Sequence, residues 1–186
     1  KRNWYLDNHE LKTEWVLFLD ADELINDAFC DEVKKAVTTG NHVGYWLNFH
    51  NWFQGKFLRH GDPFSKLALF RPDAGRYERI DDEQWSGLDM EIHEHPVLDG
   101  SIGKIGSPID HNDRRGLDSY IGKHNEYSTW EARRHLAMEM DDAESWNALT
   151  RRQKFKYRHI EKWWFKWVYF VLCYIIKLGV LDGRSG

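Results

Sequence analysis

An unbroken run of apolar residues near the start of this chain ends in two aspartates. Residues 15–19 predict a buried strand, and Asp20 and Asp22 follow at its carboxyl end. In an open α/β sheet, ligands bind just beyond the carboxyl ends of the strands. Carboxylate oxygens suit Mg²⁺ or Mn²⁺, and these ions usually also bind substrate phosphates. The segment therefore predicts a metal-dependent enzyme that acts on a phosphorylated or nucleotide-linked substrate.

A bare Asp-x-Asp motif is also common where a strand simply runs into an acidic loop. Here Glu23 adjoins the pair, and three carboxylates at one strand end repel each other unless a cation is present. The pattern disfavours an EF-hand, because the loop glycine is missing and Leu24 follows the acidic residues. Phosphatases of the haloacid dehalogenase type share the strand and the motif. They usually continue with a small hydroxylic or β-branched residue and a glycine, where this chain has Glu23 and Leu24.

Composition bounds the class of protein. The chain has 186 residues, enough for one sizeable α/β core, and its formal net charge of −4 gives no sign of a nucleic-acid partner. The high content of Trp, Phe and Tyr suits a large core, a sugar-stacking cleft or a membrane interface. Cys30 and Cys173 are isolated in the sequence, which favours a reducing compartment.

Hydrophobic periodicity predicts one α/β domain over residues 1–145 and a helical appendage over 146–186. The first helix should bury Trp4, Leu6 and Leu11, and the second should be capped by Asp27. We expect the second face of the strand predicted over residues 43–53, with Trp46 and Trp52, to lie in the core rather than stack on sugar rings. The expected strands or extended segments are 15–20, 43–53, 66–72 and 97–106, and the expected helices are 3–11, 27–38, 116–141 and 150–180.

A polar segment over residues 91–96 forms a second candidate site. Glu91, His93 and His95 are each two residues apart, so on an extended backbone all three would lie on one face and Glu94 on the other. A carboxylate here suits a general base, and the two histidines also suit a metal site. The alternative is a loop whose charged side chains are simply solvated.

His111 forms a third candidate site at the end of a glycine-rich extended stretch. A neutral imidazole there could complete a metal shell begun by Asp22, although a lone histidine at a strand end is more often structural. Arg114 or Arg115, which follow, could neutralise a phosphate.

The tail, residues 151–185, is basic at first and then rich in aromatic residues. Its uninterrupted apolar stretch, residues 167–176, is too short to span a bilayer. Lysines beside Trp, Tyr and Phe favour a helix that lies in the interface of an anionic membrane. The alternative is a helix packed against the domain.

Taken in order, these features resemble the family 2 glycosyltransferases of bacterial envelope polysaccharide and lipopolysaccharide-core synthesis. The resemblance covers nearly the whole chain, and its specificity lies in the order and spacing of the matches. The matching residues are Arg2 and Asn3, Trp15 through Glu23, Phe70 through Pro72, His93 and Glu94, His111, Lys123, Tyr127, Glu131, and Gly179 through Gly183.

The resemblance implies a GT-A fold, a Rossmann-like mixed sheet flanked by helices, and an inverting mechanism. It implies a UDP- or GDP-sugar donor held through Mg²⁺ or Mn²⁺, with Asp20, Asp22 and His111 at the metal. Arg2, Asn3 and Arg114 would also contact the donor. A glycan or lipid-linked glycan would be the acceptor, at the inner face of the bacterial cytoplasmic membrane.

In this resemblance Glu94 is the catalytic base that deprotonates the acceptor hydroxyl, and Glu91 is its rival. Enzymes of the family begin with a βαβ half that holds the nucleotide base, and this chain enters after it, so we expect a catalytic-half fragment. Two other functions stay open. They are a metal-dependent phosphatase or hydrolase with Asp20 as nucleophile, and a non-catalytic membrane-associated domain.

Overall fold

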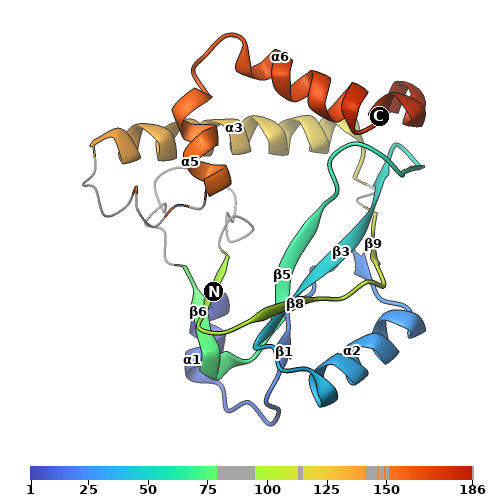
Figure 1. The fold of residues 1–186 in the computed structure, drawn as a ribbon, viewed down its shortest axis with the longest axis vertical. Coiled ribbons are helices and arrows are strands. Elements are labelled where there is room, and N and C mark those ends of the chain that lie inside the picture. The colour runs from blue at the N-terminus through green and yellow to red at the C-terminus, as the bar shows by residue number, and fades with distance from the viewer. Residues whose placement is uncertain (79–94, 113–114, 141–145, 147–148, 150, 186) are drawn as a thin grey trace.

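The computed structural model describes residues 1–78, 95–112, 115–140, 146, 149 and 151–185. It is a mixed α/β fold in which a curled sheet carries helices at its flanks (Figure 1). The helices are α1 (Arg2–Asn8), α2 (Asp27–Thr39), α3 (Leu117–Met140), α5 (Arg151–His159) and α6 (Phe165–Phe170). The strands are β1 (Val16–Leu17), β2 (Glu23–Leu24), β3 (Gly44–Phe53), β4 (Lys56–Leu58), β5 (Ser65–Phe70), β6 (Gly75–Tyr77), β7 (Pro96–Leu98), β8 (Ile102–Lys104) and β9 (Ile109–His111).

Strand β3 is the centre of the main sheet, whose order is β1-β5-β3-β9-β2. Strands β4 and β5 pair with it in antiparallel fashion, and β8 and β9 pair with it in parallel. Because β1 is antiparallel to β5, the strands β1, β3 and β9 run in one direction. Their carboxyl ends therefore face one edge of the sheet, and Asp20, Asp22 and His111 lie at or just beyond these ends.

The sheet is curled rather than flat. Lys66 of β5 and Glu23 of β2 have β3 and β9 between them in the strand order, yet their charged atoms lie 3.0 Å apart. The acidic loop, residues 20–23, follows β1, which pairs directly with β5. Extended past Leu17, the register of this pair places Asp20 opposite Lys66, so the loop begins beside β5.

The main core lies on one face of β3, where alternate residues are buried as the sequence predicts. Tyr45, Leu47 and Phe49 pack with Phe29 of α2, which is 1% exposed. The amino end of α2 is capped by Asn26, whose side chain accepts a hydrogen bond of 2.9 Å from the Phe29 N–H. The prediction that Asp27 is the cap is wrong by one residue, because Asp27 already belongs to the first helical turn.

A smaller core lies under α1. Leu6 packs there with Phe70 and Tyr77, and Leu11 lies at its margin. Trp4 is 62% exposed, so its predicted burial is wrong. The other face of β3 is also less covered than expected, since Trp46 and Trp52 are each 37% exposed.

Helix α3 matches its predicted range closely, whereas the single helix predicted over 150–180 is wrong. The chain leaves the helix after His159, forms α6, and continues as a π-helical segment (Val171–Ile176) that ends at Lys177. Leu178 has a positive φ of 60°, which ends the helical path, and Gly179–Ser185 form 3₁₀ turns. Within the described residues, every helix falls short of the length and apolarity that crossing a membrane requires.

Candidate functional site

The acidic loop is held by a lysine from a neighbouring strand. Lys66 Nζ lies 2.8 Å from Asp20 Oδ2 and 3.0 Å from Glu23 Oε1. The other carboxylate oxygen of Glu23 accepts a hydrogen bond of 2.9 Å from the backbone N–H of Asp20. The Glu23 side chain is nearly fully buried. Glu23 and Lys66 thus fix the backbone that presents Asp20 and Asp22.

Asp20 is an ionised, structurally bound carboxylate in this arrangement. Its partial burial by itself would raise its pKa, but Lys66 outweighs that effect by hydrogen bonding and by charge. Arg2, whose Nη2 lies 3.4 Å from Asp20 Oδ1, and His111 act in the same direction, so the pKa of Asp20 is lowered. The cation that the three adjacent carboxylates require is therefore supplied, for Asp20 and Glu23, by Lys66.

Asp22 lies apart from this lysine and faces β9. Strand β2 pairs with β9 so that Glu23 is opposite His111, and the Asn112 N–H donates to the Asp22 carbonyl at 3.4 Å. This pairing places Asp22 Oδ2 3.6 Å from His111 Nε2 and 3.5 Å from an Arg115 guanidinium nitrogen. The structure thus brings together two residues that the sequence assigned to one site, although they are far apart in the chain.

A divalent cation fits between Asp22 and His111 only in part. An ion held about 2.1 Å from each donor can bridge two atoms 3.6 Å apart. However, the part of the chain that is described contains no group of three or more His, Cys, Asp or Glu side chains arranged to hold a metal. Asp20 is already occupied by Lys66 and Arg2. Asp22 and His111 could therefore supply two ligands, and substrate phosphate and water would have to supply the others.

Arg2 and Asn3 differ in what they contact. Arg2 reaches the acidic loop through Asp20, and its guanidinium lies 5.2 Å from the centre of the Tyr77 ring. Asn3 instead binds the backbone of Tyr77 in both directions, with hydrogen bonds of 2.8 and 2.9 Å. Arg2 thus lies at the candidate site, whereas Asn3 joins α1 to β6.

The predicted base lies outside the described residues. Glu91, Glu94 and Arg114 all fall in that part of the chain, as does His93. His95 is described, and burial lowers its pKa, assisted by the charge of Arg134 and opposed by that of Glu78.

Lys66 is the residue at this site that the sequence analysis missed. It is the second residue of β5 and pairs opposite Leu47, which lies on the core face of β3. A lysine in phase with buried residues of a strand needs an acidic partner, because an unpaired buried charge is strongly disfavoured. The position of Lys66 on the buried face of its strand could therefore have predicted an acidic partner, but it does not indicate which residue that partner is.

A pocket of about 410 Å³ lies beside this site. It opens where residues 59–63, here called the 59–63 loop, leave the sheet between β4 and β5. Phe49 lines it and also contacts His111, with ring centres 6.4 Å apart. The remaining wall comes from β3, β4 and Lys177 of the tail. The pocket thus connects the surroundings of His111 with the tail.

The tail is latched to the 59–63 loop by Asp182, which is 4% exposed. Its carboxylate accepts hydrogen bonds from the backbone N–H groups of Arg59 and His60, at 3.0 and 2.8 Å, and lies 3.2 Å from the His60 ring nitrogen. Burial would raise the pKa of Asp182, but these contacts outweigh it and lower the pKa. Lys177 adds a salt bridge of 2.5 Å to Asp62.

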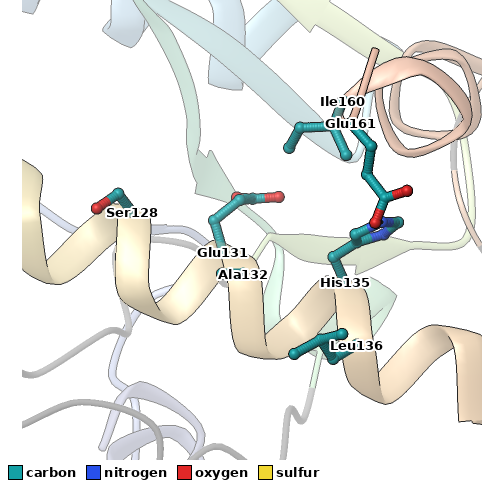
Figure 2. Close-up of a pocket in the computed structure, with 7 residues that line it drawn as sticks. All are labelled: Ser128, Glu131, Ala132, His135, Leu136, Ile160 and Glu161. Atoms are coloured by element: carbon teal, nitrogen blue, oxygen red, sulfur yellow. The ribbon is translucent and has the colours of Figure 1, made fainter. Parts of the chain in front are cut away.

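A second cavity, of about 400 Å³, lies between α3 and the end of α5 (Figure 2). Glu161 points toward His135 there, with Oε1 and Nε2 3.4 Å apart. Glu131 is bound by Lys156 at 2.6 Å, and the buried Tyr157 packs against the His135 ring. Two ion pairs, Glu161 with His135 and Lys156 with Glu131, thus cross the contact between the helices, and we assign this cavity to helix packing.

Comparisons with protein-family models, with curated proteins and with solved structures found no match to this chain.

Proposed function

We propose that this protein is a metal-dependent, inverting glycosyltransferase with a GT-A fold that uses a nucleotide-sugar donor. The proposal rests on the resemblance of the sequence together with the geometry at the carboxyl edge of the sheet. Its acceptor would be a glycan or a lipid-linked glycan of the bacterial envelope.

The observation that carries the proposal is the convergence of Asp22, His111 and Arg115. A carboxylate and an imidazole 3.6 Å apart provide two ligands for Mn²⁺ or Mg²⁺, and Arg115 provides a charge for a phosphate. Such an ion would offset the charge that develops on a departing nucleoside diphosphate. Asp20 has a different role in this proposal, because its pairing with Lys66 makes it a positioning residue for the loop.

The catalytic base of the proposed reaction is Glu94, with Glu91 as its rival. Both assignments rest on the resemblance alone, since both residues lie outside the described part of the chain.

The test uses the full-length product of the gene with Mn²⁺ and UDP-, GDP- or dTDP-sugars. We expect at least one donor to raise the melting temperature and to release nucleoside diphosphate in a metal-dependent way. Asp22→Ala should reduce that release by about 100-fold or more, because it removes a ligand of the ion that stabilises the transition state. Asp31→Ala, on the exposed side of α2, is the matched control. Full activity of Asp22→Ala would overturn the proposal.

A phosphatase remains a second candidate, because Lys66 keeps the Asp20 carboxylate ionised, as a nucleophile requires. It predicts phosphate release from p-nitrophenyl phosphate that Asp20→Asn abolishes. Release at the uncatalysed rate by the wild-type protein in Mg²⁺ would exclude this candidate.

We further propose that the tail binds the surface of an anionic membrane on its cytoplasmic side. Its large apolar side chains are exposed, among them Trp163, Trp167 and Ile176, which are 76%, 58% and 67% exposed. Basic residues accompany them, as in helices that lie in the lipid interface.

Co-sedimentation with vesicles tests this placement. We expect binding to phosphatidylglycerol vesicles, weaker binding to phosphatidylcholine vesicles, and loss of binding in Trp163→Ser/Trp167→Ser. Trp4→Ser, an equally exposed tryptophan on α1, is the control and should bind as the wild type does. Equal binding of the double variant would contradict the placement.

A further inference from the structure

Planar side chains gather around Phe57, which lines the pocket at the 59–63 loop. The Phe57 ring lies 4.6 Å from the His50 ring and 5.6 Å from the Trp52 ring, measured between centres. The Arg59 guanidinium lies 5.9 Å from the centre of the same Phe57 ring. Trp52 lies beside the pocket lining and is 37% exposed, so this cluster, here called the aromatic platform, is open to solvent at its edge.

Polar groups that can both donate and accept hydrogen bonds surround the platform. His50 Nδ1 lies 3.0 Å from Asp110 Oδ1 on β9, and Asn51 lines the same pocket. Asp62 is bound to Lys177, and His60 is bound to Asp182. Among the described residues, Arg59 is the lining cation that forms no ion pair.

The chemistry of these groups favours a hydroxyl-rich ligand with an apolar face. The acidic and basic side chains of the lining are largely paired with each other, so the pocket presents many hydrogen-bonding atoms and little net charge. A sugar ring offers hydroxyl groups at its rim and C–H groups on its face. Aromatic rings bind such an apolar face, while planar amide, carboxylate and guanidinium groups bind hydroxyls.

We propose that the 59–63 loop pocket is a sugar-binding subsite, with Phe57 as the stacking surface and Arg59 as a hydrogen-bond donor to a sugar hydroxyl. This subsite rests on the proposed function, because its ligand would be the acceptor sugar of that reaction. Phe49 lines the pocket and also contacts His111, so the pocket lies next to the candidate metal ligands. The tail forms one wall of the pocket through Lys177, and Asp182 holds that wall in place.

The position of the pocket supports an acceptor rather than a donor. The residues that converge on Asp22 lie on the β9 side of β3, whereas the 59–63 loop lies on its β4 and β5 side. A sugar in the pocket would therefore lie next to the tail, where a lipid-linked glycan at a membrane surface would arrive.

The experiment is saturation-transfer NMR on the full-length protein with glucose, galactose, mannose and N-acetylglucosamine, without nucleotide or divalent cation. We expect at least one sugar to bind, and Phe57→Ala and Arg59→Gln each to raise its Kd by about tenfold, the loss expected for one stacked ring or one charge-assisted hydrogen bond. Arg71→Gln and Phe155→Ala, which lie outside the pocket, are the matched controls and should leave the Kd unchanged.

Two outcomes would overturn the subsite: no sugar binds, or the sugar binds equally well to Phe57→Ala and Arg59→Gln. A parallel titration with inorganic phosphate tests whether the pocket binds an anion instead. Phosphate binding that depends on Arg59, in the absence of sugar binding, would also overturn the proposal, because it would make the pocket an anion site. Since the assay contains neither donor nor metal, its result is independent of the Asp22→Ala test, and the two proposals can fail separately.

Discussion

Glu23 is the residue around which the acidic loop is organised. Its nearly buried carboxylate binds Lys66 with one oxygen and the Asp20 backbone with the other. We expect Lys66→Met to lower the free energy of unfolding by about 3 kcal/mol, because it leaves a buried carboxylate without its cation. Urea unfolding measures this loss. Lys34→Met, which removes an exposed lysine that pairs with the exposed Asp31, should change stability by less than about 0.5 kcal/mol.

The pH dependence of stability reports the ionisation of Asp20. Because the pKa of Asp20 is lower in the folded than in the unfolded chain, its contribution is complete above the unfolded value of 3.8. The contribution is lost as the pH falls through the folded value. We therefore expect the wild type to lose more stability than Asp20→Asn when urea unfolding is compared at pH 6 and pH 3. Equal losses of stability in the two proteins would show that folding does not lower the pKa of Asp20.

At the residue scale, sequence reasoning identified the members of the site better than their partners. The sequence predicts that Asp22 and His111 share one site, and the structure places their charged atoms 3.6 Å apart. The neutralisation of Asp20 by Lys66 is not predicted from the sequence, because a lysine 46 residues away comes near through the pairing of β1 with β5. Sequence periodicity indicates which face of a strand a residue occupies but does not report which strands are neighbours.

At the scale of elements, the sequence and the structure assign the N-cap of α2 to different residues, Asp27 and Asn26. Asn26→Ala should cost about 1 kcal/mol of stability, because it removes the hydrogen bond that caps the Phe29 N–H. Asp27→Ala should cost only about 0.3 kcal/mol, since Asp27 lies in the first turn, where its charge interacts with the helix dipole. Thermal or urea unfolding of both variants decides between the two residues. A larger loss in Asp27→Ala would restore the original prediction.

Regular segments were predictable where their periodicity was long and uninterrupted. The predicted ranges for β3 and α3 match the structure within a few residues, because each has one consistently apolar face or a long helical pattern. The tail was predicted as one helix because its residues are nearly all good helix formers or apolar. Its break at Leu178 follows contacts of Lys177 to Asp62 and to Gly61 of the 59–63 loop, and its break at residues 160–164 lies where Glu161 faces His135 of α3. Local sequence does not encode either contact.

At the scale of the whole molecule, the Asp182 latch joins the tail to the sheet. Asp182→Ala removes a buried carboxylate and leaves the Arg59 and His60 N–H groups without this acceptor. We expect the tail to open more often and chymotrypsin to cleave at its aromatic residues about tenfold faster. Asp73→Ala, which alters an exposed pair with Arg71, is the control. An unchanged cleavage rate in Asp182→Ala would mean that other contacts hold the tail.

The latch also orders events during synthesis. Asp182 follows the loop that it binds by 122 residues, so it leaves the ribosome roughly 6 to 25 s after His60 at usual elongation rates. In that interval the 59–63 loop lacks the carboxylate that accepts its N–H groups, while β3, β4 and β5 can already pair. Asp182, which holds the Lys177 wall of the pocket in place, is therefore translated after the residues that line the pocket. A nascent chain halted before Asp182 would carry the sheet with this wall not yet held.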